Sequence, residues 1–248
     1  MSKRTNRKKL AILQSNYIPW KGYFDLINSV DEFIIYDDMQ YTKNDWRNRN
    51  KIKVKQGTQW LTIPVRQETL EQTIANTRVA SDIWRIKHWK SISQAYSRSR
   101  SFKESAASLE PLYMSNEEVM LSQINYAFIV AVNDLLGITT KVSWASRYEL
   151  MGSRTERLVN LCKQTGSQIY VTGPAALRYL DSTLFAREQV EVLAANYSGY
   201  PEYEQLYPPF EHTVSIIDLL FSRGSGSRAF MKTFPESVQS EPFLVSAY

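Results

Sequence analysis

EFIIYDD, residues 32–38, is the stretch that decides the fold class. Its Phe, Ile, Ile and Tyr residues form a short apolar run that ends abruptly in two aspartates. Such a run is typical of a strand buried inside a sheet. KLAILQS, residues 9–15, has the same form, and the segment between the two runs, from Pro19 to Val30, is typical of a helix opened by proline. A strand, a helix and a second strand predict an α/β fold.

The rest of the chain continues this alternation. Two segments around Gly57, 46–55 and 58–65, predict a β-hairpin near the N-terminus. Strands are also predicted at 73–80, 141–145, 168–173 and 191–197, and helices at 81–96, 101–113, 116–136, 153–165, from Pro174 onward and at 215–222. We therefore predict an α/β fold with a central, mostly parallel sheet and an inserted helical segment around 81–137. Residues 1–9 are predicted to be a disordered basic tail, residues 10–224 one domain or two closely packed lobes, and residues 225–248 a C-terminal tail.

The composition indicates a soluble globular protein of 248 residues. Its formal charge of +5 suggests an anionic partner, but the first nine residues contain five basic residues and no acid. The remainder has 25 basic against 25 acidic residues and is formally neutral. A single cysteine fits a reducing compartment, and no apolar run approaches the length of a membrane span. We expect a cytoplasmic protein without membrane insertion.

DWRNRNKIKVK, residues 45–55, places a cation at every second position. Alternate residues of a strand point to the same face, so one face would carry the row Arg47, Arg49, Lys51, Lys53 and Lys55. Such a row fits a strip for nucleic acid, a grip for a phosphorylated small molecule or a solvated face. Several aspartates nearby and the neutral body make nucleic acid the minority interpretation. The favoured interpretation is a phosphate-binding site, with the outer lysines of the row exposed to solvent.

The segment 36–53 is the densest cluster of polar and aromatic residues in the chain. Asp37 and Asp38 follow a predicted strand, the usual place for functional groups in an open α/β sheet. One carboxylate could act as a general base or bind a hydroxyl, and nearby cations could hold a phosphate. The same pattern also fits a surface hairpin whose acids and bases pair with each other or are solvated.

The remaining ionisable candidates are few. His88 lies on the shoulder of an apolar helical stripe, which fits either a packing role or a general base. Cys162 falls on the buried face of the predicted helix 153–165, which favours a structural role over a nucleophile. Two histidines and one cysteine, far apart in sequence, do not predict a metal site.

Several long segments together resemble the WbqC-like family of bacterial surface-polysaccharide clusters. The resemblance covers about residues 10 to 224 and is carried by QSNYIPWKGYFDLI (14–27), DEFIIYDDMQYTKNDWRNRNKIK (31–53), QWLTIPV (59–65), KHWKSISQAY (87–96), GSQIYVTGPAALRYLD (166–181), YEQLYPPFEH (203–212) and SIIDLLFSRG (215–224). One departure is Ser15, where the family usually has proline. The resemblance implies one WbqC-like α/β domain over 10–224 and a role in modifying nucleotide-linked sugars, as in O-antigen biosynthesis.

We therefore expect an N-acyltransferase, aminoacyl in the favoured version, that acts on a nucleotide-linked amino sugar. The donor would be a thioester on an acyl carrier protein or on coenzyme A, with no tightly bound cofactor. The alternatives are a non-catalytic subunit that binds a sugar nucleotide and a nucleic-acid-binding protein that uses residues 47–55. We assign catalysis to His88, Asp37 and Asn48, and substrate binding to Gln14, Tyr17, Trp20, Tyr23, Asp38, Gln40, Lys43, Trp46, Arg47, Arg49 and Asn50. His88 and Asp37 are both candidates for the general base.

Overall fold

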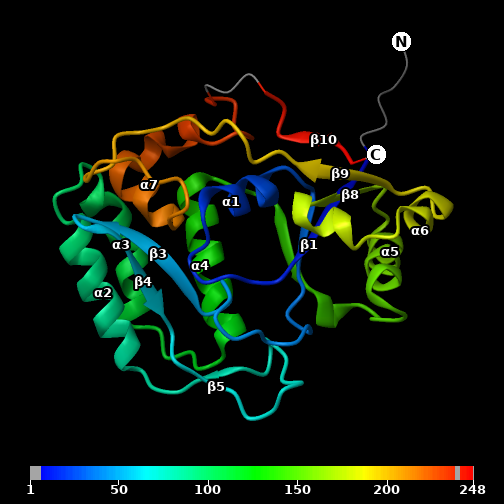
Figure 1. Ribbon diagram of the computed structural model, residues 1–248, viewed down its shortest axis with the longest axis horizontal. Helices are drawn as coiled ribbons and strands as arrows, with labels where there is room; N and C mark the ends of the chain where they lie inside the picture. Colours follow the sequence, from blue (N-terminus) through cyan, green and yellow to red (C-terminus); the bar gives the residue numbers. More distant parts are fainter. Residues whose placement is uncertain (1–6, 238–240, 248) are drawn as a thin grey trace.

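The computed structural model describes residues 7–237 and 241–247, and its central feature is a mixed sheet (Figure 1). From one edge to the other, the strands are β10 (Leu244–Ser246), β9 (Glu191–Ala195), β8 (Ile169–Thr172), β1 (Lys9–Leu13), β2 (Glu32–Ile35) and β7 (Lys141–Trp144). All neighbours pair in parallel except β10, which is antiparallel to β9. The predicted α/β class with a mostly parallel sheet is confirmed.

Helices cover both faces of this sheet. Leu10 and Ile12 of β1 face the core that contains α5 (Arg154–Thr165) and α6 (Ser182–Arg187). Ala11 faces the larger core, which contains α1 (Lys21–Asn28). Helix α1 connects β1 to β2 on one face, whereas α5 precedes β8 on the other. The winding therefore reverses between β1 and β8, and ligands of such sheets bind beyond the carboxyl ends of the strands at this reversal.

The helical insertion and the hairpin lie beside the sheet. The insertion contains α2 (Ile83–Tyr96), α3 (Phe102–Met114) and α4 (Leu121–Leu136), and the later helix α7 (Ile216–Arg223) packs with them. The hairpin consists of β3 (Arg49–Val54) and β4 (Gly57–Thr62). A short second pair follows, β5 (Val65–Arg66) with β6 (Arg78–Val79). Short 3-10 helices occur at Ala145–Arg147, Pro174–Arg178 and Gly224–Phe230.

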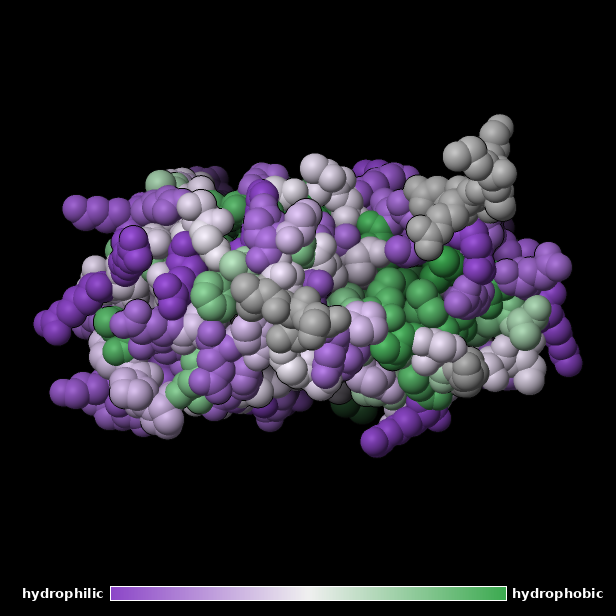
Figure 2. Space-filling model, turned by 90° about the horizontal axis from the view of Figure 1, so that it is seen from above, coloured by the Kyte–Doolittle hydropathy of each residue, from purple (hydrophilic) through white to green (hydrophobic). Residues whose placement is uncertain are grey.

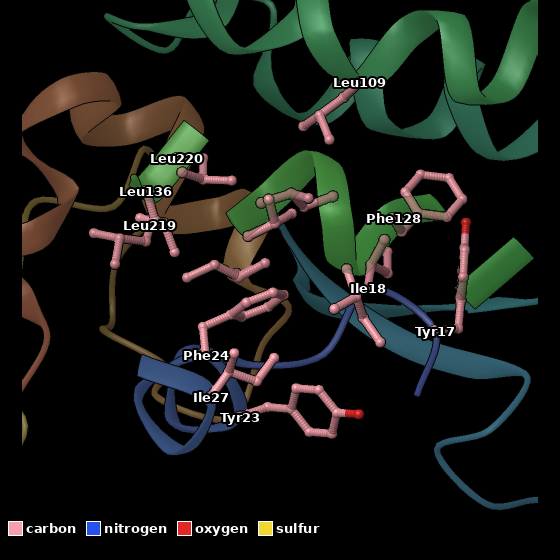
Figure 3. Packing of buried hydrophobic residues seen from close by; sticks show 14 of the residues in the cluster. Tyr17, Ile18, Tyr23, Phe24, Ile27, Leu109, Phe128, Leu136, Leu219 and Leu220 are labelled. Carbon is pink, nitrogen blue, oxygen red and sulfur yellow. The ribbon is translucent and has the colours of Figure 1, made fainter. Parts of the chain in front are cut away.

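One continuous core joins these parts (Figure 3). Phe24 and Ile27 of α1 lie beside Ile18 of the preceding loop, opposite side chains from α4 and α7. Phe128 of α4 packs edge-on against Tyr17, with the ring centroids 5.5 Å apart. Burial of large side chains of this kind contributes roughly 1.5–3 kcal/mol each. The loop that follows β1 is therefore held between the sheet and the helical insertion.

Three predicted elements differ in extent or type from the structure. The predicted helix 116–136 begins only at Leu121, because the Asn116 and Glu118 side chains accept hydrogen bonds from the backbone N–H groups of residues 118–120 and form a turn instead. The predicted strand 73–80 contributes only β6, and the helix predicted from Pro174 onward starts as a 3-10 helix.

The two predicted tails contribute to the fold where the structure describes them. Residues 1–6 lie outside the described residues, but Arg7 pairs with Glu191 and Lys9 begins β1. In the segment 225–248, predicted as a tail, β10 forms an edge strand and the backbone N–H groups of Lys232 and Thr233 donate to buried Asp25. These contacts are made with distant residues, so the weak periodicity of the segment gave no sign of them. Residues 238–240 and 248 lie outside the described part.

Hydrophilic side chains cover much of the face shown in Figure 2, with a hydrophobic patch towards the end where β9 and β10 lie. Across residues 7–237 and 241–247, no helix combines the length and the apolar character needed to cross a membrane.

Candidate functional site

The chain segments that leave β1 and β2 are tied together at the carboxyl edge of the sheet. The backbone N–H and the hydroxyl of Ser15 donate to the Asp37 carboxylate at 2.8 and 2.6 Å, and the Ser122 hydroxyl of α4 donates to the same group. Asp37 is 1% exposed. Burial raises the pKa of Asp37, although these donors and the nearby Arg47 charge act in the opposite direction. Asp37 thus fixes the position of the loop that begins at Gln14.

Arg47 is bound to that loop by its guanidinium group. Its two terminal nitrogens donate to the side-chain oxygens of Gln14 and Asn16. Asn125 of α4 donates to the Arg47 backbone carbonyl at 2.9 Å and to the Ser15 hydroxyl at 3.0 Å. A planar guanidinium held at two points has a defined orientation and remains charged at every physiological pH. Arg47 therefore supplies a fixed positive charge beside the carboxyl end of β1.

A large cavity opens at the point where the sheet winding reverses; we call it the sheet-edge crevice. Its volume is about 720 Å³. It is lined by Ile12, Leu13, Gln14, Tyr36, Met39, Gly152, Ser153, Arg154, Thr155, Arg157, Leu158, Tyr170, Thr172, Ala176, Tyr179 and Leu180. Apolar walls with a few converging polar groups are typical of sites for small ligands. Ligands of open α/β sheets generally bind beyond the carboxyl ends of the strands where the winding reverses, and the crevice lies at this place.

The start of α5 gives one wall of the crevice a positive character. Arg154 is exposed and makes no hydrogen bond or ion pair within the described chain. The Nε of Arg157 donates to the Gly152 carbonyl at 2.9 Å, which holds that arginine against the loop. The free N–H groups of a helix start favour an anion, although Glu156 already accepts from the Ser153 N–H at 2.6 Å. Arg154 and Arg157 therefore give this wall positive charge, which the Glu156 carboxylate at the same helix start offsets in part.

A second, smaller cavity, the tryptophan pocket, lies on the other side of Arg47. It has a volume of about 230 Å³ and is lined by Asn16, Pro19, Trp20, Trp46, Asn50 and Thr213. Trp46 is 42% exposed and its ring centroid lies 5.5 Å from that of Trp60, which is 45% exposed. The Arg49 guanidinium lies 4.4 Å above the Trp60 ring. Two neighbouring exposed indoles provide an apolar platform, because large apolar side chains left in water at one place often mark a binding surface.

The crevice and the tryptophan pocket share one wall. Gln14 lines the crevice, Asn16 lines the tryptophan pocket, and the Arg47 guanidinium binds both side chains. The guanidinium itself lines neither cavity, and it also lies 3.6 Å from the Asp45 carboxylate. The two cavities are therefore linked through Gln14 and Asn16, which Arg47 holds in place.

The structure gathers part of the predicted site around this wall. Gln14, Trp20, Trp46, Arg47 and Asn50 line the cavities or form the wall between them. The buried Tyr23 hydroxyl donates to the Gln14 carbonyl at 3.0 Å. The Asn50 amide donates to the carbonyls of Tyr17 and Ile18, so it helps to fix the conformation of the loop that follows β1.

His88 and Tyr17 lie in a separate buried group. The Tyr17 hydroxyl lies 2.9 Å from Nδ1 of His88 and 2.8 Å from the Tyr113 hydroxyl. His88 lines neither the crevice nor the tryptophan pocket, but a small cavity with Trp84 and Pro64. Burial lowers the pKa of His88 to about 4, so its imidazole is neutral at pH 7. The catalytic role of His88 stays a prediction that this geometry does not favour.

The other predicted site residues are spread around the hairpin. The buried Asn48 amide donates to the Ile63 carbonyl at 2.8 Å, and the exposed Gln40 donates to the Leu70 carbonyl at 2.5 Å. Lys43 is exposed and Asp38 is half-buried, and neither lines the crevice or the tryptophan pocket. The Arg49 side chain donates to Asn44 while it stacks on Trp60.

The predicted cationic row does not form one open face. Arg47 precedes β3, and Lys53 is 3% exposed, with its ammonium donating to the Pro209 carbonyl at 2.6 Å. Lys51 donates to the Thr213 hydroxyl at 2.9 Å. The prediction that the outer lysines are solvated is wrong for Lys53, because residues 209–215 cover this part of the hairpin. A strip for nucleic acid along 47–55 finds no support in this arrangement.

Cys162 is fully buried on α5, as its position in the helix predicts. Burial raises the pKa of its thiol to about 12. A thiol of that kind is protonated at pH 7 and is no nucleophile.

Sequence reasoning missed the residues of the crevice wall, above all Arg154, Arg157, Thr172 and Tyr179, and it missed Trp60. A signal exists for the first two: Ser153 and Glu156 have the capping-box spacing at the start of the predicted helix 153–165. The capping box predicts a helix start but does not say what lies beside it. The start of α5 lies near the end of β1 because the strands are ordered β8-β1-β2, and no local sequence pattern reveals that order.

Comparisons with known proteins give a family match and a relative. The profile of the WbqC-like protein family matches residues 14–229. The uncharacterized protein Rv1507c of Mycobacterium tuberculosis is 46% identical over 226 residues, which are 91% of this chain and 98% of that protein. No solved structure gives a significant match.

Proposed function

The chain belongs to the WbqC-like protein family, and we propose that it transfers an acyl group, aminoacyl in the favoured version, from a thioester to the amine of a nucleotide-linked sugar. The single observation that carries the proposal is the shared wall of Gln14, Asn16 and Arg47 between the sheet-edge crevice and the tryptophan pocket. Two substrates can approach this wall from opposite sides.

The nucleotide-linked sugar is assigned to the sheet-edge crevice. Its diphosphate would lie against the start of α5, where Arg154 and Arg157 supply positive charge. The sugar would then point towards Gln14, whose amide group can bind a hydroxyl. The volume of about 720 Å³ fits a ligand of this size class.

The donor is assigned to the tryptophan pocket. The apolar surface of Trp20, Trp46 and Pro19 suits the acyl chain and the thioester end of the arm that carries it. That arm would belong to an acyl carrier protein or to coenzyme A. The thioester carbonyl would then lie beside the Arg47 guanidinium.

The reaction needs positioning and charge stabilisation. The neutral amine nitrogen attacks the thioester carbonyl, and a C–N bond forms as the carbonyl oxygen becomes an oxyanion. Arg47 stabilises that oxyanion because its charge is fixed before the reaction begins. The oxyanion then collapses, the C–S bond breaks and the thiolate leaves. The thiolate takes up the proton that the amine nitrogen loses, so the products are an amide and a thiol. In this scheme Asp37 is a positioning residue, since it holds Ser15 and the loop that contacts Arg47.

The proposal is tested by incubating the protein with a nucleotide-linked amino sugar and acyl thioesters of coenzyme A and of an acyl carrier protein. Released thiol and the mass of the acylated sugar nucleotide report the reaction. Arg47→Gln should lower kcat and also lower the thermal stability, because Arg47 holds Gln14 and Asn16, so circular dichroism is needed to show that the variant is folded. Arg66→Gln, at an exposed position of β5, should leave kcat unchanged. Unchanged turnover in Arg47→Gln would contradict the assignment.

A second candidate, a subunit that binds the sugar nucleotide without turnover, is favoured by one observation. Among the residues that line the crevice and the tryptophan pocket, as far as the chain is described, none is a carboxylate, a histidine or a thiol. Calorimetry that shows binding of the sugar nucleotide, with no product from any thioester, would select this candidate.

A further inference from the structure

A hollow separate from the candidate site lies where α2 and α7 end; we call it the arginine hollow. Its volume is about 320 Å³, and it is lined by Arg98, Ser99, Arg100, Glu204, Gln205, Leu206, Ser222 and Arg223. Figure 1 shows α2, α3 and α7 at the opposite end of the molecule from α5, which borders the sheet-edge crevice. The hollow therefore cannot be a subsite of the crevice.

Its three arginines lack acidic partners. Arg98 and Arg100 are exposed, and across the described chain neither makes a hydrogen bond or an ion pair. The Arg223 guanidinium lies 5.0 Å from the centre of the Phe230 ring, which orients it without neutralising it. Glu204 is the one carboxylate among the lining residues, so the hollow has an excess of positive charge.

Two buried polar atoms at the hollow also have no partner. The hydroxyl oxygen of Ser99 and the Nε of Arg223 are shielded from solvent without a hydrogen bond to the described protein. Buried polar atoms without a partner are uncommon in folded proteins, and a bound group is one way to satisfy them. Ser99 and Arg223 both line the hollow, and a hydroxyl and a guanidinium group are donors for an anion.

The wall of the hollow is held in place without any ligand. The Gln205 amide donates to Oδ1 of buried Asp218 at 2.9 Å, and its oxygen accepts from the Glu211 N–H at 2.8 Å. These bonds fix the segment 204–206 against α7. The segment belongs to the stretch YEQLYPPFEH, residues 203–212, to which the proposed transfer reaction assigns no role.

We propose that the arginine hollow binds the phosphate or diphosphate group of a small molecule. Guanidinium groups match phosphate oxygens in pairs, and three of them line a hollow of about 320 Å³ that a compact group can enter. A flat acidic protein surface would meet the exposed Arg98 and Arg100 but would not fill the hollow. The observations therefore favour a phosphorylated small molecule as the occupant.

The test is calorimetric titration of the full chain with inorganic pyrophosphate. In the double variant Arg100→Gln and Arg223→Gln, the dissociation constant should rise at least about tenfold, since each bond to a charged group contributes above 1 kcal/mol. Arg98→Gln should also weaken binding, and this exposed position is not required for folding. Arg66→Gln, at an exposed arginine outside the hollow, should leave the constant unchanged.

Arg154→Gln separates this site from the sheet-edge crevice. If pyrophosphate binding is lost in Arg154→Gln and kept in the double variant, the anion binds in the crevice and the proposal is overturned. Absence of any pyrophosphate binding would overturn it as well. The first result would instead support the position that the proposed function gives the diphosphate in the crevice, whereas acyl transfer itself is measured separately by the thioester assay.

Glu204→Gln gives an independent check with the opposite sign. Removing the carboxylate removes repulsion of the anion, so pyrophosphate should bind more tightly than to the unmodified chain. An unchanged or weaker affinity would place the phosphate outside the hollow.

Discussion

Ser15 donates to Asp37 twice, from its backbone N–H to Oδ1 at 2.8 Å and from its hydroxyl to Oδ2 at 2.6 Å. The two residues follow β1 and β2, neighbouring parallel strands that end at the same edge of the sheet. This pair therefore fixes the first turn of the loop that carries Gln14 and Asn16. Both of these residues orient the Arg47 guanidinium.

Ser15→Ala should lower the free energy of unfolding by roughly 1–3 kcal/mol, because it leaves a buried carboxylate oxygen short of a donor. The measurement is urea unfolding followed by circular dichroism. Ser225→Ala, at an exposed position, should change the stability by less than about 0.5 kcal/mol. Equal effects in the two variants would show that the Ser15 hydroxyl does not hold this turn.

Glu32→Gln should destabilise the protein at pH 7 and much less at pH 2. Burial alone would raise the pKa of Glu32, but bonds from Tyr148, two lysines and Ser143 lower it to about 2 from its ordinary 4.5. A carboxyl whose pKa is lower in the folded state contributes stability above the unfolded value, and this contribution is lost as the pH falls towards 2. Urea unfolding across this pH range tests the sign. Glu188→Gln, at an exposed ion pair, should have little effect at any pH.

His88 should stay neutral well below pH 6.5. Burial lowers its pKa to about 4, so between about 4 and 6.5 the unfolded chain binds a proton that the folded chain does not. His88 therefore reduces the stability as the pH falls through this window. Two-dimensional NMR of the imidazole groups measures the titration directly. A His88 resonance that titrates near pH 6.5 would contradict the burial and restore this residue as a base.

Trp46→Ala should weaken binding of the acyl thioester by roughly tenfold, since a stacked aromatic wall contributes about 1 kcal/mol or more. Its stability should change by less than about 0.5 kcal/mol, because the side chain is 42% exposed. Trp60→Ala should have a smaller effect on binding, as Trp60 lies behind Trp46 and outside the pocket lining. Affinity is measured by calorimetry with a non-hydrolysable thioester analogue. Unaltered affinity in Trp46→Ala would move the donor out of the tryptophan pocket.

The main strands could be predicted from the sequence because their signal is local. KLAIL and EFII are apolar on both faces, and both form strands buried in the middle of the sheet. The hairpin around Gly57 was equally visible, since strand residues alternate on each side of a residue with a φ of 121°. Polar residues at the ends of β1 and β2 predicted a candidate site at this edge of the sheet. In the structure the Arg47 guanidinium donates to the Gln14 side chain at this edge.

The rest depended on contacts between distant segments. Arg154 borders the crevice only because β8 pairs with β1, so that α5 begins beside the end of β1. Lys53 belongs to a regular alternation, yet it is buried because a segment more than 150 residues later covers it. His88 sits at a helical position that fits either packing or catalysis, and only the surrounding aromatic residues place it away from both cavities.

The most direct test of the account is whether a nucleotide-linked amino sugar binds in the sheet-edge crevice. The midpoint of thermal unfolding is measured with a panel of nucleotide-linked sugars, for the unmodified chain, Arg154→Gln and Arg66→Gln. A ligand that prefers the folded state raises this midpoint. We expect a rise with amino-sugar nucleotides that persists in Arg66→Gln and is strongly reduced in Arg154→Gln. No rise with any member of the panel, or an equal rise in all three proteins, would contradict it.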